Sequence, residues 1–232
     1  MDIQLYYEEY GTGEHLVLLH GNNEDSRYFV HQIEYFQKQY HVIAVDTRGH
    51  GKSPRGKAPF TLIQFAKDLK EFLDEHGWKK IHLLGFSDGG NIAVYFALMY
   101  PEYIDRLILN GANLHPDGVK KWIQISSCFE YLLESIKAHF WKNAKRKKEM
   151  LGLMVKQPNL PVHVLKRIPN QTLVIAGKQD MIKESHTRSI AGMIPNGRLC
   201  IIEGDHFIAK KEPEKFNKII EKFLKLEERN EI

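Results

Sequence analysis

A regular alternation of short apolar runs with amphipathic helical patterns is the feature that most constrains the fold of this chain. Runs that are apolar on both faces are typical of strands in a buried parallel sheet. Six such runs end in turn residues: HLVLLHG (15–21), HVIAVD (41–46), KIHLLGF (80–86), RLILNGA (106–112), QTLVIAG (171–177) and RLCIIEG (198–204). An earlier run, IQLYYEEY (3–10), alternates apolar and polar residues, which predicts a partly exposed strand.

Amphipathic helical patterns separate these runs, near residues 26–38, 61–76, 89–100, 184–193 and 212–227. Strands that alternate with helices are connected by right-handed crossovers in a layered α/β domain. The sequence therefore predicts a doubly wound, mostly parallel seven-stranded sheet with residues 3–10 at its edge. A chain of 232 residues is an ordinary length for one such domain.

The interval 113–168 interrupts the alternation, because it has no strand pattern. Its apolar residues recur at steps of three and four, which predicts helices, and QPNLP (157–161) ends the segment. We expect a short inserted helical lid over residues 113–168, above the carboxyl edge of the sheet. Residues 1–112 and 169–232 would then form the α/β core.

Positive charge is concentrated in the same interval. It holds eleven Lys and Arg against four Asp and Glu, whereas the whole chain carries a formal net charge of +4. This excess either attracts an anionic substrate or surface or is simply a solvated helix face, and the second interpretation is favoured. Nucleic-acid binding is not predicted, because no recognised module interleaves base-reading residues with the charge.

Metal binding, membrane insertion and export are also not predicted. Cys128 and Cys200 lie far apart, and no H-x-x-x-H or C-x-x-C spacing occurs, so no metal or cofactor is expected. The longest apolar stretch (92–100) is about half of the roughly 20 residues that span a membrane. The start of the sequence lacks the pattern of a signal peptide. We expect a soluble cytoplasmic protein with a small-molecule substrate, as a monomer or a homodimer.

The hexapeptide GFSDGG (85–90) carries the strongest local signal for chemistry. Residues 85–89 match G-x-S-x-G, and they lie between a predicted strand and a predicted helix, which is the context that this motif requires. The strand must turn sharply into the helix with Ser87 at the apex, so the residues two before and two after it have to be very small. A glycine-rich turn without catalytic function is the alternative, but the context favours a nucleophile.

A serine nucleophile needs a base, and the base needs an orienting acid. On such an elbow the acid and the histidine follow the serine in that order, each beyond the carboxyl end of a strand. Asp180 follows the run 171–177 and His206 follows the run 198–204. Asp180 as a plain turn residue and His206 as a loop histidine are the alternatives. Rival bases are His20, His41, His50, His82 and His186, and rival acids are Glu203 and Asp205. Asp46 ends an earlier strand, and we expect it to tie down the turn DTRGHGKS that it begins.

Acyl transfer also needs N–H donors for the developing oxyanion. One donor is the backbone N–H of the residue after the nucleophile, here Asp88. The second comes from the loop after the strand 15–21, and we assign it to the backbone N–H of Asn22. The side chain of Asp88 lies in the first turn of a predicted helix, where a carboxylate is favoured electrostatically.

Taken together, HLVLLHGNN, VIAVDTRGHGKS, LLGFSDGGNIA, AGKQD and GDHF resemble the α/β-hydrolase superfamily across nearly the whole chain. GFSDGG followed by YPEYIDRLILNGAN is similar to its valacyclovir-hydrolase (biphenyl-hydrolase-like) branch and to related bacterial serine esterases. The superfamily resemblance implies the fold, the Ser87–Asp180–His206 triad and a two-step acyl-enzyme hydrolysis. The branch resemblance implies that Asp88 binds a substrate ammonium.

The chain departs from the superfamily pattern in two places. Members usually begin with an additional strand before the one that matches 3–10, and this sequence leaves no room for it, which again gives seven strands. The inserted segment is short and matches no single branch well. Substrate identity therefore does not follow from the resemblance. Phe129, Tyr131, Phe140 and Trp141 are candidate pocket walls in the lid, with packing inside the lid as the alternative for each.

The predicted function is hydrolysis of a small carboxylic ester, with amino-acid esters as one class, through an acyl-enzyme on Ser87. The same triad also supports aminopeptidase-like cleavage or hydrolysis of a C–C bond, so these stay open. A non-catalytic ligand-binding member of the fold is a further alternative. An alkyl-halide dehalogenase is disfavoured, because that chemistry uses an aspartate where Ser87 stands.

Overall fold

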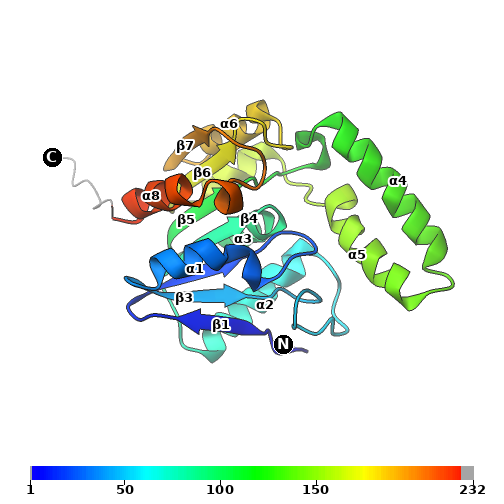
Figure 1. Cartoon of the computed structure of the whole chain (residues 1–232), viewed down its shortest axis with the longest axis horizontal. Coiled ribbons are helices and arrows are strands. Elements are labelled where there is room, and N and C mark those ends of the chain that lie inside the picture. The colour runs from blue at the N-terminus through cyan, green and yellow to red at the C-terminus, as the bar shows by residue number, and fades with distance from the viewer. Residues whose placement is uncertain (1, 226–232) are drawn as a thin grey trace.

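A single seven-stranded sheet organises the computed structural model, which describes residues 2–225. The strand order is β1-β3-β2-β4-β5-β6-β7; β1 is antiparallel to β3 and every other neighbouring pair is parallel (Figure 1). This confirms the predicted mostly parallel, seven-stranded sheet. The strands are β1 (Tyr7–Tyr10), β2 (Glu14–Leu19), β3 (Tyr40–Val45), β4 (Ile81–Phe86), β5 (Ile104–Asn110), β6 (Gln171–Gly177) and β7 (Gly197–Ile202).

The first strand is shorter than the predicted 3–10, because β1 begins only at Tyr7. Tyr6 instead bonds the loop that follows β3. Its backbone N–H donates to Oγ of Ser53 (2.8 Å), and its carbonyl accepts from the N–H of Asp46 (2.9 Å). Tyr6 therefore fastens that loop, and residues 3–6 lie outside the strand.

Helices cover both faces of the sheet (Figure 1). One face packs against α1 (Val30–Phe36) and α8 (Pro213–Leu224), and the other against α2 (Leu62–Glu75), α3 (Asp88–Met99) and α6 (Glu184–Met193). The pattern near 26–38 forms the 3₁₀ turn Ser26–Phe29 followed by α1, and a short α7 (Ile208–Lys211) precedes α8. Residues 226 and 227, at the end of the last predicted helix, lie outside the described residues.

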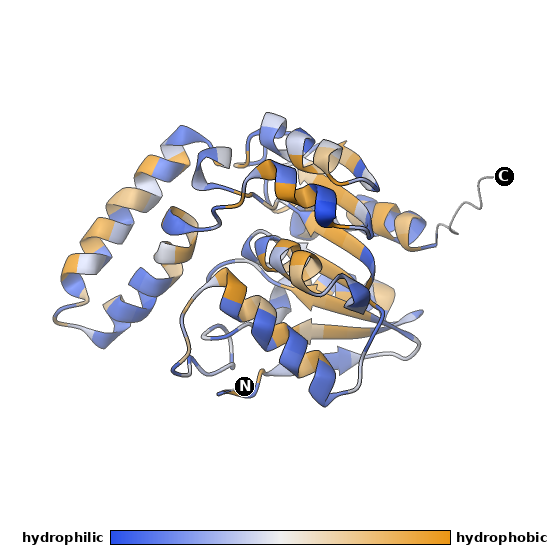
Figure 2. Ribbon diagram, turned by 180° about the vertical axis from the view of Figure 1, so that it is seen from behind, coloured by the Kyte–Doolittle hydropathy of each residue, from blue (hydrophilic) through white to orange (hydrophobic). Residues whose placement is uncertain are grey.

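Burial on both faces explains why the strand sequences are almost continuously apolar. In β2, Leu16 and Leu18 pack into the cluster beneath α1 and α8, while Val17 and Leu19 pack into the cluster beneath α2, α3 and α6. The apolar residues accordingly gather on the strands and on the helix faces that meet them (Figure 2). One-sided burial would have produced alternation instead.

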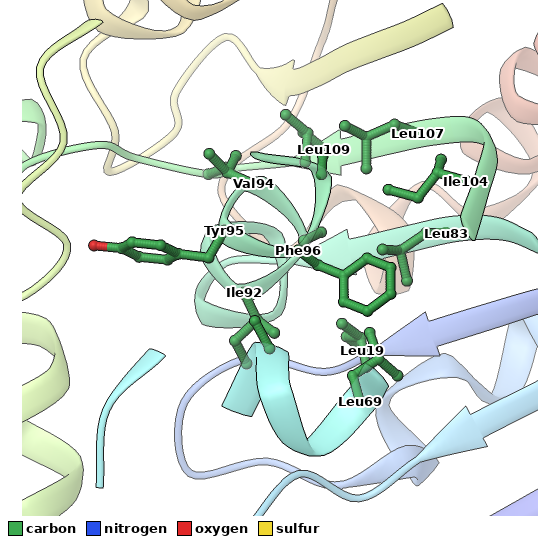
Figure 3. Packing of buried hydrophobic residues seen from close by; sticks show 14 of the residues in the cluster. Leu19, Leu69, Leu83, Ile92, Val94, Tyr95, Phe96, Ile104, Leu107 and Leu109 are labelled. Carbon is green, nitrogen blue, oxygen red and sulfur yellow. The ribbon is translucent and has the colours of Figure 1, made fainter. Parts of the chain in front are cut away.

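Helix α3 is buried along nearly its whole length, because it lies between the sheet and α2. Phe96 of α3 points toward Leu83 of β4, with Leu69 of α2 nearby (Figure 3). Phe96 is completely buried, so truncating it to alanine would cost about 3–5 kcal/mol of stability. This packing fixes the helix whose first residue follows Ser87.

Two helices stand apart from the sheet between β5 and β6. They are α4 (Lys121–Lys137) and α5 (Lys142–Lys156), flanked by the 3₁₀ turns Pro116–Gly118 and Val162–Arg167, and they lie beyond the carboxyl ends of the strands (Figure 1). Arg55 fastens α5 to the core through a bidentate ion pair with Glu149 (2.8 and 3.0 Å). The division into core and lid at residues 113 and 168 stays a prediction. None of the helices within residues 2–225 has both the length and the apolar content to cross a membrane.

Candidate active site

Ser87 lies at a sharp turn between β4 and α3. Its backbone angles are φ 53° and ψ −118°, a left-handed φ that a non-glycine residue adopts only where the surroundings impose it. A Cβ on Gly85 would come within 2.3 Å of the Gly89 carbonyl oxygen, and one on Gly89 within 2.0 Å of the Leu19 carbonyl oxygen. Gly85 is therefore required for the steric reason that the sequence suggested, whereas Gly89 is required because the end of β2 lies against it.

The predicted nucleophile, base and acid lie in contact with one another. Nε2 of His206 is 3.0 Å from Oγ of Ser87, and Nδ1 of His206 is 2.7 Å from Oδ1 of Asp180. Asp180 follows β6 and His206 follows β7, so both come from the carboxyl edge of the sheet, and both side chains are buried. Asp180 is itself oriented, because its Oδ1 also accepts from the N–H of Ile182 (2.9 Å).

This contact order selects one histidine tautomer. The carboxylate of Asp180 accepts a hydrogen bond, so Nδ1 of His206 carries the proton and Nε2 presents a lone pair to Ser87. The arrangement can therefore remove the hydroxyl proton of Ser87 as its oxygen attacks an electrophile.

Gly111, directly after β5, leaves room for the ring of His206. It was not predicted as a site residue. It has φ +63°, and a Cβ there would come within 2.7 Å of Cε1 and 2.9 Å of Nδ1 of His206. Its N–H donates to the carbonyl of Ile175 in β6 (3.1 Å). The turn NGA is visible in the sequence, but the need for its glycine arises from a histidine far along the chain.

The two residues predicted to supply oxyanion donors lie side by side. Nδ2 of Asn22 donates to Oδ2 of Asp88 (2.8 Å) and also to the carbonyl of Met150 in α5 (2.9 Å). Asp88 is the first residue of α3, so its N–H has no acceptor within the helix. The loop of Asn22 begins at Gly21, whose N–H donates to Oε2 of Glu24 (3.2 Å).

The carboxylate of Asp88 is buried, and its hydrogen-bond donors among residues 2–225 are side-chain amides. It accepts from Asn22 and, at 3.3 Å, from Nδ2 of Asn91, which also donates to Oδ1 of Asn113 (3.0 Å). Burial raises the pKa of this carboxyl above its ordinary value. Among residues 2–225 no Lys or Arg forms an ion pair with it.

A cavity of about 700 Å³ opens at Ser87 and Asp88. Its wall is mostly apolar and comes from the loop after β5, the first half of α4, the end of α5 and the turn after β6. The other residues along it are Asn113, His115, Pro116, Asp117, Val119, Ile123, Gln124, Ile125, Ser127, Cys128, Met154, Val155, Lys156, Asn159, Met181 and Ile182. Such a cavity suits a small organic substrate.

The predicted aromatic pocket walls lie elsewhere. Phe129, Phe140 and Trp141 are 61, 76 and 61% exposed and do not line the cavity at Ser87. Tyr131 lines a separate cavity between α4 and α5. The residues of α4 along this cavity are Ile123, Gln124, Ile125, Ser127 and Cys128, so its wall on this helix ends just before Phe129. These aromatic side chains are therefore not brought to the site.

His20, His50 and Asp46 bond the loops in which they lie, rather than Ser87. His20 donates from Nδ1 to the carbonyl of Gly21 (2.8 Å) and accepts at Nε2 from the N–H of Thr47 (3.0 Å). Burial lowers the pKa of His50 to about 3, which keeps it neutral. Asp46 accepts from the N–H groups of Ser26 (2.7 Å) and Lys52 (2.8 Å), and so ties down the turn after β3 as the sequence predicted.

Glu24 is a second residue near the site that was not predicted. Its carboxyl accepts from the N–H of Gly21, and burial raises its pKa to about 7, an effect that the nearby His206 and Lys210 partly offset. In the sequence it is one acid in a polar loop, and only the fold shows that it is partly buried. The part of the chain that the structure describes holds no group of three His, Cys, Asp or Glu side chains arranged to bind a metal ion.

A serine elbow between β4 and α3, at the carboxyl edge of a mostly parallel sheet, defines the class as the α/β hydrolases. The chain belongs to that family, since the model of the alpha/beta hydrolase fold matches residues 14–149. The predicted superfamily and the hydrolase class are thereby confirmed.

The chain is also similar to individual hydrolases, in sequence and in structure. The chain is similar to the human serine hydrolase BPHL, with 29% identity over 96% of this chain and 83% of the human protein. Among solved structures, a hydrolase from Pseudomonas aeruginosa PA01 superposes with a TM-score of 0.81 at 22% identity, covering 97% of this chain and 95% of that one. A thermophilic esterase from Thermogutta terrifontis gives 0.78 at 24% identity, covering 96% and 93%. At these identities the two structures show the fold alone.

Proposed function

We propose that this hydrolase cleaves small carboxylic esters through an acyl-enzyme on Ser87. The observation that carries the proposal is the position of His206, with Nε2 at 3.0 Å from the Ser87 hydroxyl and Nδ1 at 2.7 Å from Asp180. A serine is a weak nucleophile unless a base takes its proton, and the base is efficient only when held in the correct tautomer. His206 lies in reach of the Ser87 proton, and its hydrogen bond to Asp180 holds the required tautomer.

The reaction then has two halves. His206 takes the proton of Ser87 as its oxygen attacks the ester carbonyl, and then gives that proton to the departing alkoxide. Water, deprotonated by the same Nε2, attacks the acyl carbon; the bond to the Ser87 oxygen then breaks, and His206 returns the proton to that oxygen as the acid is released. The Asp180 carboxylate stabilises the imidazolium that forms in each half.

The oxyanion of each tetrahedral intermediate is assigned to the backbone N–H groups of Asn22 and Asp88. Such donors act where charge develops, and the loss of one typically costs about 2.7–4 kcal/mol of transition-state stabilisation. The side-chain contact between these residues supports the assignment, because it holds the loop after β2 against the start of α3. Helices α4 and α5 act as the lid, since their residues form the outer wall of the cavity.

Amino-acid esters are the first substrate class to test. The Asp88 carboxylate lies beside Ser87 in the cavity, and its partners among the described residues are the side-chain amides of Asn22 and Asn91. A buried carboxylate without a cationic partner is costly, so it favours a substrate that brings an ammonium. The similarity to the human serine hydrolase BPHL, which covers 96% of this chain, supports serine hydrolysis as the reaction, and the choice of amino-acid esters rests on Asp88.

The test compares p-nitrophenyl esters of simple acids with matched esters of α-amino acids. We expect turnover of both, faster for the α-amino esters, and no turnover by Ser87→Ala. In Asp88→Asn the preference for the amino group should disappear while the simple esters are still cleaved. Equal kcat/KM of the wild type for the two classes would refute the amino-acid assignment, and turnover by Ser87→Ala would refute the nucleophile.

A further inference from the structure

Helix α4 turns its apolar face to solvent. Isolated exposed apolar residues are common, but a contiguous patch of this size on a monomer marks an interaction surface. We call this patch the α4 stripe, and it continues into the turn toward α5. Its members with their exposed fractions are Trp122 (68%), Ile125 (70%), Phe129 (61%), Leu132 (58%), Leu133 (39%), Ile136 (57%), Phe140 (76%) and Trp141 (61%).

Residues 2–225 leave the α4 stripe uncovered. The opposite side of α4 packs against α5, where Glu134 is paired with Lys147 (3.4 Å) and the ammonium of Lys156 lies 4.8 Å from the ring centre of Tyr131. Helix α5 stands between α4 and the core, and α4 forms the outer edge of the molecule in both whole-chain views (Figures 1 and 2). The usual amphipathic arrangement, apolar side inward, is thus reversed in this helix.

The spacing of the α4 stripe fits a partner helix. Positions 122, 125, 129, 132 and 136 follow steps of three and four, which is the repeat of a seam between two packed helices. The positions beside the seam include Ser126, Cys128 and Ser135, which carry no charge. Within α4 itself two Lys and two Glu cancel, so the helix is neutral and the positive charge of this region sits mainly on α5. A neutral apolar seam suits a copy of itself better than an anionic surface.

We propose that α4 packs against α4 of a second copy of this chain about a two-fold axis. A buried aromatic side chain covers roughly 200 Å², so Trp122, Phe129, Phe140 and Trp141, at 61–76% exposure, offer about 500 Å² between them. The aliphatic members add further area. The total approaches the buried surface of about 800 Å² that each partner contributes to a stable interface.

The pairing would also stiffen the active site. Ile123, Gln124 and Ser127 of α4 line the cavity at Ser87, together with Ile125, which is also a member of the α4 stripe. A second helix packed on the stripe would therefore hold the outer wall of the cavity in place. The pairing itself does not depend on the proposed ester hydrolysis.

Sedimentation velocity on the full chain tests the proposal. Wild type should sediment with twice the 27.0 kDa mass of the chain. Phe129→Glu and Leu132→Glu place a charge at the centre of the seam and should raise the dissociation constant by at least about 30-fold. Val30→Glu is the matched control, since Val30 of α1 is 52% exposed outside the α4 stripe, and it should stay dimeric. Unchanged far-UV circular dichroism would show that the variants are folded.

Three outcomes would overturn the proposal. The first is a single-chain mass for the wild type at the highest concentration that stays in solution. The second is a dimer that Phe129→Glu and Leu132→Glu leave intact. The third is co-flotation of single chains with phospholipid vesicles that is lost in Phe129→Glu, which would assign the α4 stripe to a lipid surface.

Discussion

The side-chain amide of Asn22 lies 2.8 Å from Oδ2 of Asp88, and this hydrogen bond joins the two residues whose N–H groups we assign to the oxyanion hole. The same amide reaches the carbonyl of Met150, so the loop after β2, the start of α3 and helix α5 meet at one side chain. A shift of α5 or a loss of charge on Asp88 would therefore also change how the loop after β2 is held.

Replacing Asn22 with alanine removes both hydrogen bonds but keeps the backbone N–H. The Asp88 carboxylate then retains only Asn91 as a side-chain donor, and we expect a loss of about 1–3 kcal/mol in the free energy of unfolding. The loop is also less well held, so kcat should fall about tenfold or more. Urea unfolding and steady-state ester hydrolysis measure the two effects, and wild-type values in both would contradict this role.

Gly111→Ala tests how much room the backbone leaves for the ring of His206, the residue that we propose as the base. The added Cβ would meet the His206 ring at 2.7 Å, and the displaced ring should lower kcat by about 100-fold or more in a folded protein. Gly192→Ala is the matched control, because no atom lies within 4 Å of a Cβ at that position in α6. It should keep full activity, and equal kcat in the two variants would show that the position of the ring is not sensitive to Gly111.

Glu24→Gln tests the raised pKa of that carboxyl. The folded protein keeps the Glu24 proton up to about pH 7, whereas the unfolded chain releases it near 4.5, so the wild type loses stability as pH rises across this window. The variant does not titrate and still offers an acceptor to Gly21. It should match the wild type near pH 4.5 and exceed it at pH 8 by about 1–2 kcal/mol, allowing for solvent screening. If the free energies of unfolding of the wild type and the variant differ by the same amount at every pH in this range, the raised pKa of Glu24 is contradicted.

Much of the fold could be predicted from the sequence, because burial on both faces leaves a continuous apolar run for each central strand. The triad residues were accessible for a related reason. Ser87 is marked by a local steric motif, and Asp180 and His206 each follow a strand at the edge of the sheet where the serine must lie. Order along the chain and position at one edge singled out three residues that the structure brings into contact, and their catalytic role stays a prediction.

The features that were missed depend on contacts between distant segments. Residues 3–6 continue an alternating pattern, but the backbone N–H of Tyr6 bonds Ser53 in the loop after β3, and the strand begins only at Tyr7. Gly111 and Glu24 gain their roles from His206 and from the burial of a loop, which no local pattern records. The apolar pattern of α4 correctly indicated a helix, but periodicity does not say what an apolar face meets. Phe129, Phe140 and Trp141 were therefore assigned to a cavity that they do not line.

The most direct measurement of the central claim is the intact mass of the protein after treatment with a fluorophosphonate. We predict one phosphonyl group per chain, located on Ser87 by peptide mapping, with no adduct in Ser87→Ala. In His206→Ala the labelling rate should fall by about 10³-fold or more, because the serine then lacks its base. An unlabelled wild type, or equal labelling of Ser87→Ala, would contradict the assignment of Ser87 as the nucleophile.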